Sequence, residues 1–193
     1  RRVAVFFAQD DAYSTAETAI FQKVLAARGL KPVSIQRTQL ADNDFQNPIT
    51  AALQQRPQLV VISAQAVDGG NLIRQLRELG FRGQIVVGNG LNTPNIYPIC
   101  QRWCDGILIA QAYSPELNTP INARFKQLYR QANGDQPPPQ IAAQAFAAYA
   151  RSRGIEIGSY SLLASRSVGG GHDVVMPPGL KPVFGNSPCL QSR

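Results

Sequence analysis

The sequence predicts an α/β fold in which a doubly wound parallel sheet of about five strands is covered by helices on both faces. Two observations support this fold class. The strand-like segments are apolar throughout and rich in β-branched and aromatic residues, and they alternate with segments whose apolar residues recur at helical spacing. Strands without a polar face must be buried on both sides, as they are in a parallel sheet between two helical layers.

The elements follow one another in a regular order. Strands are predicted at 2–8, 32–36, 58–63, 84–87 and 106–110. A first helix is expected from Ser14 or Thr15, as N-cap, to the stop at Gly29. The next begins after a cap at Asp44 and ends before Pro57, and a third begins at Asp68 and ends at Gly80. A last helix is predicted at 120–132. The alternation of these strands and helices predicts a sheet of flavodoxin-like strand order.

Composition excludes several classes of protein. The net charge of +7 is spread along the 193 residues rather than clustered on one element, which argues against nucleic-acid binding. No apolar run approaches the ~20 residues of a membrane span. With three cysteines and one histidine, His172, we expect no metal site. Cys100 and Cys104 share a helical face, which suits a local disulfide or two small buried thiols equally.

The informative residues are those that follow each strand, because ligands of such sheets bind outside the carboxyl ends of the strands. These loops carry hydrogen-bonding and aromatic side chains suited to a small polar solute. We therefore expect a binding site that contains Asp11, Tyr13, Ser63, Gln65, Asn89 and Tyr113.

The same loops show no catalytic motif. Gly88-Asn89-Gly90 lacks the third glycine of a phosphate-binding GxGxxG, because Thr93 stands in its place. The single histidine lies beyond the five-strand unit, and no GxSxG motif follows a strand. We expect no catalytic residue, no metal and no cofactor, so the chain is predicted not to be an enzyme.

The order of several short motifs resembles the branched-chain amino-acid-binding family of ABC-transporter solute receptors, which have the type I periplasmic binding fold. The resemblance covers about 2–147 and includes Asp10-Asp11-Ala12-Tyr13 after the first strand, Gly88-Asn89-Gly90-Leu91 after the fourth, and Tyr113-Ser114-Pro115 after the fifth. It implies that this chain corresponds to the second lobe of a two-lobed receptor. Residues 1–147 are then the ligand-binding lobe, and 148–193 are an irregular tail, either disordered or non-native.

The resemblance also implies roles for three residues. The tyrosine that matches Tyr13 lines the ligand, the residue that matches Gln65 is often aromatic and touches it, and the residue that matches Asn89 is often acidic and pairs with the ligand's amino group. Gln65 and Asn89 depart from that pattern. An amide in place of a carboxylate loses a charge-assisted hydrogen bond, which weakens the expectation of an α-amino ligand.

The expected function is therefore ligand binding in a periplasmic or other extracytoplasmic receptor, with a small solute such as an amino acid as ligand and an ABC permease as partner of the full-length protein. A sensor domain of the same fold, fused to a signalling effector, is one alternative, and an enzyme of flavodoxin-like architecture is another. We also expect a homodimer through an exposed lobe-lobe surface formed by Ala142, Ala145, Phe146 and Tyr149.

Overall fold

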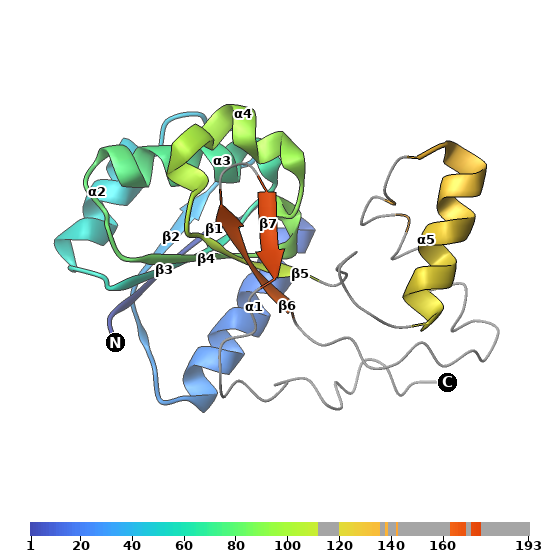
Figure 1. Ribbon diagram of the computed structural model, residues 1–193. Helices are drawn as coiled ribbons and strands as arrows, with labels where there is room; N and C mark the ends of the chain where they lie inside the picture. Colours follow the sequence, from blue (N-terminus) through green and yellow to red (C-terminus); the bar gives the residue numbers. More distant parts are fainter. Residues whose placement is uncertain (112–119, 136–137, 139–141, 143–162, 169–170, 175–193) are drawn as a thin grey trace. The chain divides into compact units, whose positions relative to one another are not determined.

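The computed structural model describes residues 1–111, 120–135, 138, 142, 163–168 and 171–174 (Figure 1). The chain divides into two compact units, Arg1–Ala110 with Ser165–Asp173 and Gln111–Ala164 with Val174–Arg193, and each is described by itself. Strands and helices alternate in the first unit: β1 Val3–Ala8, α1 Ala12–Ala27, β2 Pro32–Thr38, α2 Gln46–Gln54, β3 Leu59–Ser63, α3 Ala66–Glu78, β4 Gln84–Val87 and β5 Leu108–Gln111. The predicted boundary at residue 147 lies outside the described residues and stays a prediction.

The sheet has the order β2-β1-β3-β4-β5-β6-β7, and the pairs among the first five strands are parallel. This confirms the predicted fold class and the flavodoxin-like order of β1 to β5. An irregular tail was expected at 148–193. The structure instead has two strands there, β6 (Leu163–Val168) and β7 (Gly171–Val174).

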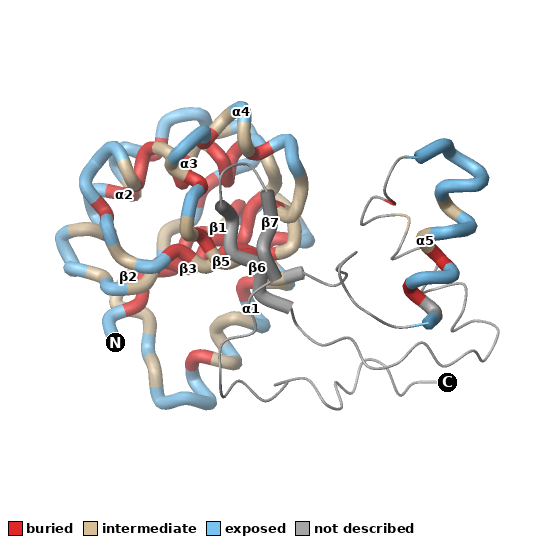
Figure 2. Tube along the Cα trace, in the orientation of Figure 1, coloured by how far each residue is buried: buried red, intermediate tan, exposed pale blue. Residues whose placement is uncertain are grey.

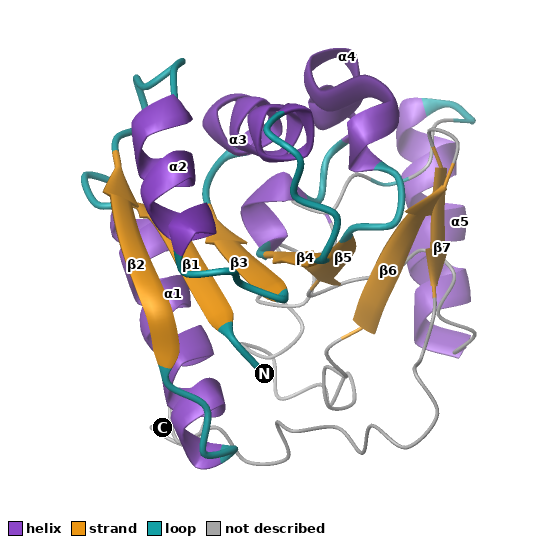
Figure 3. Ribbon diagram, turned by 90° about the vertical axis from the view of Figure 1, so that its left-hand side faces the viewer, coloured by secondary structure: helices purple, strands orange, loops and turns teal. Residues whose placement is uncertain are grey.

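Helices lie on both faces of the sheet, as Figure 3 shows, and the residues of β1 pack alternately against the two helical layers. Ala4 and Phe6 of β1 pack with residues of α2 and α3, whereas Val3 and Val5 pack with Leu25 of α1. All four strand residues are fully buried, and Figure 2 shows the buried residues concentrated in the strands and the adjoining helix faces. Burial on both faces explains why β1 is apolar at every position, since burying a Val or Phe side chain contributes about 1.5–3 kcal/mol.

The helices begin at other residues than the sequence predicted. The N-cap of α1 is Asp11 instead of Ser14 or Thr15, because the Asp11 carboxylate accepts a hydrogen bond from the Ser14 backbone N–H at 3.0 Å. Helix α3 begins at Ala66, so Asp68 lies within its first turn. In both helices the N-cap is a polar residue that lies upstream of the predicted start, next to the free backbone N–H groups of the first turn.

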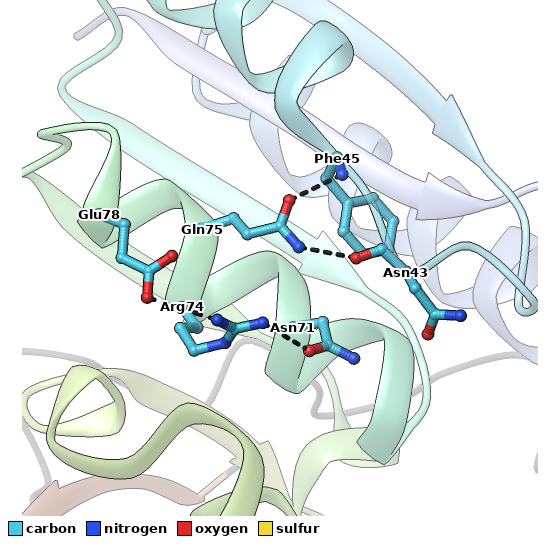
Figure 4. A network of polar contacts seen from close by, with 6 residues as sticks. All are labelled: Asn43, Phe45, Asn71, Arg74, Gln75 and Glu78. Carbon is cyan, nitrogen blue, oxygen red and sulfur yellow. Dashed lines mark hydrogen bonds and ion pairs between the residues drawn. The ribbon is translucent and has the colours of Figure 1, made fainter.

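Two side chains satisfy the backbone at the start of α2. The N-cap position is Phe45, whose ring is buried in the core, and the predicted cap residue Asp44 lies one position earlier, where its Oδ1 accepts from the Gln46 backbone N–H at 2.9 Å. Gln75 of α3 adds a second cap: its Oε1 accepts from the Phe45 backbone N–H and its Nε2 donates to the Asn43 carbonyl, both at 2.8 Å (Figure 4). On the outer side of α3, Arg74 forms an ion pair with Glu78 at 3.4 Å.

The connection from β4 to β5 contains α4 (Tyr97–Cys100) and short 3₁₀ helices at Asn89–Leu91, Pro94–Ile96 and Gln101–Cys104. Cys100 and Cys104 form a disulfide with a Cα–Cα distance of 5.5 Å, which decides between the two alternatives that the sequence left open. The second unit contains α5 (Pro120–Asn133), close to its predicted range. Among the residues described, no helix has the length and apolar character needed to cross a bilayer.

Candidate ligand-binding site

The carboxyl ends of β1, β3 and β4 bring five of the six predicted site residues to one edge of the sheet. Asp11 and Tyr13 follow β1, Ser63 ends β3 and Gln65 follows it, and Asn89 follows β4. Parallel pairing of these strands places their ends side by side. The sixth residue, Tyr113, lies outside the described residues.

A hydrogen bond between side chains ties the loop after β1 to the loop after β3. The Gln65 Nε2 donates to Asp11 Oδ2 at 3.0 Å, and the same oxygen accepts from the backbone N–H and hydroxyl of Ser14. Burial opposes the charged form of Asp11, but the hydrogen bonds from Ser14 and Gln65 outweigh it and hold the pKa of this carboxyl below its usual value. One oxygen of Asp11 is therefore occupied by the cap and by Gln65.

A second set of contacts ties α1 to the loop after β4 through Glu17, a residue that the sequence analysis missed. Glu17 Oε1 accepts from the Tyr13 hydroxyl at 2.5 Å and from the Asn89 backbone N–H at 2.9 Å. Burial raises the pKa of the Glu17 carboxyl, although hydrogen bonds from Tyr13 and Asn89 partly oppose this. The available signal in the sequence was the spacing of four residues from Tyr13, which places both side chains on one helical face.

Tyr13 remains accessible while its hydroxyl is held. The residue is 37% exposed, which leaves part of it accessible to a solute. Burial of the remainder raises the pKa of Tyr13, and the hydrogen bond to Glu17 and its negative charge raise it further. Tyr13 is thus a neutral phenol whose hydroxyl donates a hydrogen bond to the Glu17 carboxylate.

Two glycines allow these side chains to approach the end of β4. A Cβ on Gly88 would overlap with the carboxylate of Glu17. A Cβ on Gly90 would overlap with the Ala64 carbonyl and would lie 3.2 Å from Tyr13 Cε1 and 3.3 Å from Gln65 Oε1. The loop after β4 therefore lies against both Tyr13 and Gln65. Its glycines are needed because a larger residue would overlap with neighbouring atoms, so they need no phosphate-binding role to explain them.

Several oxygens near this edge are buried and have no hydrogen-bond partner among the described residues. They are Ser63 Oγ, Glu17 Oε2, Thr18 Oγ1 and Asp68 Oδ2. The Ser63 side chain is fully buried, and its hydroxyl lies near enough to the Glu17 carboxyl to lower the pKa of that group.

The described part of the chain contains no cluster of three or more His, Cys, Asp or Glu residues that could hold a metal ion. The side chains that converge at the sheet edge are a phenol, carboxylates, amides and a hydroxyl. These groups can orient a small polar solute through hydrogen bonds.

The family model described as "Periplasmic binding protein" matches residues 1–150. The chain belongs to the periplasmic binding protein family. This confirms the family and the type I fold that the motif order indicated. No curated protein sequence matches this periplasmic binding protein.

Solved structures of similar fold support the same assignment. A leucine binding protein LivK from Thermotoga maritima is 20% identical with a TM-score of 0.74, and the match covers 91% of this chain and 59% of that one. A putative branched-chain amino acid ABC transporter from Rhodospirillum rubrum is 17% identical with a TM-score of 0.78, over 90% of this chain and 60% of that one. This periplasmic binding protein chain therefore spans less than two thirds of these two structures.

A third structure was solved with a ligand. It is the branched-chain amino acid transporter substrate binding protein LivJ from Streptococcus pneumoniae in complex with isoleucine, 19% identical with a TM-score of 0.64. The match covers 76% of this chain and 42% of that one. At these identities the comparison shows a shared fold.

Proposed function

We propose that this chain is a ligand-binding lobe of an extracytoplasmic solute receptor that serves ABC transport and catalyses no reaction. Its ligand is a small polar solute such as an amino acid. The observation that carries the proposal is the convergence of Tyr13, Gln65 and Asn89 at the carboxyl ends of three parallel strands, where solutes bind in folds of this kind.

The ligand class and transport role are supported by the names of the structural neighbours, which include leucine and branched-chain amino acid binding proteins. The extracytoplasmic location is supported by the family and by the Cys100–Cys104 disulfide, since disulfides persist in oxidising compartments. In a receptor that closes around its ligand, the ligand stabilises the closed state through contacts with both lobes. An isolated lobe is therefore expected to bind weakly.

The test is a calorimetric or NMR titration of the chain with leucine, serine and aspartate, which represent aliphatic, polar and acidic solutes. Tyr13→Ala should abolish saturable binding, because Tyr13 is the exposed aromatic group of the site. Ile20→Ala is the matched control, since Ile20 lies on the same helix with its side chain 52% exposed. Equal affinity of the parent and Tyr13→Ala proteins would contradict the proposed site.

The sensor alternative would use the same site, and sequence beyond this chain separates the two: a permease in the same operon favours transport, whereas a fused effector favours sensing. The predicted homodimer rests on Ala142, Ala145, Phe146 and Tyr149, of which only Ala142 lies within the described residues. Light scattering at high protein concentration tests it, and a monodisperse monomer would contradict it.

A further inference from the structure

A short loop closed by the Cys100–Cys104 disulfide carries Arg102 and Trp103. A covalent link between residues so close in the sequence restricts the conformations that the loop can adopt. Gln101, in the same loop, has φ 48° and ψ −135°, a region that residues other than glycine rarely occupy. Strained backbone of this kind persists where the surrounding structure imposes it, and it is often found at functional sites. The loop therefore holds Arg102 and Trp103 in a fixed arrangement.

Trp103 joins this loop to the connection between α3 and β4. The guanidinium carbon of Arg102 lies 4.6 Å from the centre of the Trp103 ring, and that of Arg82 lies 5.9 Å from it. Both distances are within the reach of a cation–π interaction. The Arg82 Nη1 also donates to the backbone carbonyls of Arg77 at 2.6 Å and Phe81 at 3.2 Å. The loop and the connection thus hold two guanidinium groups over one indole ring.

A third arginine, Arg77, is held beside Arg82 by the backbone. Its Nη1 donates to the carbonyls of Phe81 at 3.0 Å and Gly83 at 2.8 Å. Its guanidinium carbon lies 5.6 Å from the centre of the Phe81 ring. Burial lowers the pKa of Arg77, and the like charge of Arg82 lowers it further. The fold therefore keeps two arginines close enough to repel each other.

Three arginines and a tryptophan make up this cluster: Arg77, Arg82, Arg102 and Trp103. Among the described residues no arginine of the cluster forms an ion pair, since the ion pair present there joins Arg74 and Glu78. The other carboxylate near the cluster in the sequence is Asp105, one negative charge beside three positive ones. Like charges held together oppose folding, and perturbed groups of this kind concentrate at functional sites. A negatively charged partner would complete the cluster.

The cluster lies at the edge of the sheet opposite to the candidate solute site. β4 begins at Gln84, just after Arg82, and β5 begins at Leu108, shortly after the disulfide loop. Since β4 and β5 are parallel, these amino ends lie side by side, whereas the solute site lies at the carboxyl ends. Arg82 and Arg102 are both exposed. A partner can therefore reach the cluster without competing for the solute site.

We propose that this cluster is a docking surface for an acidic segment of a protein partner, whose carboxylates pair with the exposed guanidinium groups of Arg82 and Arg102. Planar guanidinium groups bind carboxylates through two parallel hydrogen bonds. Arginine and tryptophan are also enriched among the residues that dominate binding at protein interfaces. Because the backbone and the disulfide already hold these side chains, little conformational freedom is lost on docking.

An anionic lipid surface fits the cluster less well. Stable binding to a membrane surface requires an apolar anchor in addition to basic residues. The Trp103 ring is partly buried and lies under two guanidinium groups, so it does not supply such an anchor. The cluster presents charge and planar donors, which match carboxylates of a folded or extended protein segment.

The test uses the fluorescence of Trp103, which is the one tryptophan of the chain and so reports on this cluster alone. The probe is hexaglutamate with both ends blocked, added to the full chain at about 0.15 M salt, and hexaglutamine is the uncharged control. Arg102→Gln removes one charge of the cluster. Arg37→Gln is the matched control, because it removes the charge of an exposed arginine on β2, at the far side of the sheet from β5.

Hexaglutamate should change the Trp103 fluorescence in a saturable way, and hexaglutamine should not. Arg102→Gln should weaken the affinity for hexaglutamate by at least about fivefold, and Arg37→Gln by less than about twofold. No saturable response to hexaglutamate, or an equal loss in the two variants, would overturn the proposal. Tyr13→Ala should respond as the parent does. A loss of the response in that variant would place the peptide in the solute site and would also overturn the proposal.

Vesicles separate a protein partner from a lipid one. Phosphatidylcholine and phosphatidylglycerol at about 3:1 supply an anionic surface without carboxylate side chains. We expect these vesicles to leave the Trp103 emission unchanged at the same salt concentration. A blue shift that Arg102→Gln abolishes, together with no response to hexaglutamate, would identify a lipid surface as the partner and refute docking of an acidic protein segment.

Discussion

Gly88→Ala is expected to destabilise the protein although its backbone can accept alanine. Gly88 has φ −78° and ψ 177°, an extended conformation in which alanine is unstrained. By itself the substitution would stabilise the fold by about 0.4–1 kcal/mol through the unfolded chain. In the folded protein, however, the new methyl group would overlap with the Glu17 carboxylate. The carboxylate must move away and lose its hydrogen bond to the Asn89 backbone N–H.

The magnitude follows from these contacts. A hydrogen bond to a charged group contributes about 1.5–3 kcal/mol, and overpacking costs about 1–3 kcal/mol where the neighbour cannot yield. Because the carboxylate is the mobile end of its side chain, we take the lower part of the second range. Gly88→Ala should therefore lower the free energy of unfolding by about 2 kcal/mol.

The assay is a double-mutant cycle with Glu17→Ala, measured by urea unfolding of the four proteins. In the Glu17→Ala background the space is empty, so Gly88→Ala should be neutral or slightly stabilising. The coupling free energy should be about 2–3 kcal/mol, as for residues in direct contact. If Gly88→Ala costs the same in both backgrounds, the cost arises elsewhere and the packing of Glu17 against Gly88 is not its cause.

Three further predictions concern stability. Gln75→Met keeps the volume but leaves the buried Phe45 backbone N–H unpaired, so urea unfolding should show a loss of about 2–4 kcal/mol; a loss below about 0.5 would contradict the role of Gln75 as the cap of α2. Burial raises the pKa of Asp68 from 3.8 to about 6, so between these values the folded state binds more protons and the free energy of unfolding falls as the pH rises, by up to about 3 kcal/mol. Asp68→Asn should flatten this pH dependence, and parallel curves for the two proteins would exclude Asp68 as its source. Replacing both Cys100 and Cys104 by serine should cost roughly 2 kcal/mol, because the closed loop is short; thiol titration of the unfolded parent checks the disulfide itself, and free thiols at both positions would refute it.

The central strands β1 and β3 could be predicted from the sequence because burial on both faces leaves a continuous apolar run. The helix faces were harder. Ile20 is an apolar residue of α1, yet it is 52% exposed, whereas Thr18 is buried. Apolar spacing cannot reveal a packed face that carries small polar residues such as Ser14 and Thr18.

The candidate site was predictable in outline because strand ends of a parallel sheet lie together. For Glu17 the sequence offered only its spacing of four residues from Tyr13, because its other partner is a backbone N–H 72 residues away, and a backbone group leaves no trace in a sequence. The same holds for Gln75, whose side chain caps a helix that begins 29 or 30 residues earlier in the chain. Local patterns reveal elements, whereas side-chain bonds between distant elements require the structure.

Two hydrogen bonds between segments distant in the sequence, from the Gln65 side chain to Asp11 and from the Asn89 backbone N–H to the Glu17 carboxylate of α1, preorganise this half of the site. Ordering a side chain at a binding surface costs about 0.5–1.5 kcal/mol, and here that cost is met during folding rather than when the solute arrives. Changing the side chain at Gln65 would consequently require a paired replacement at Asp11, since a new side chain at either position also disturbs the other.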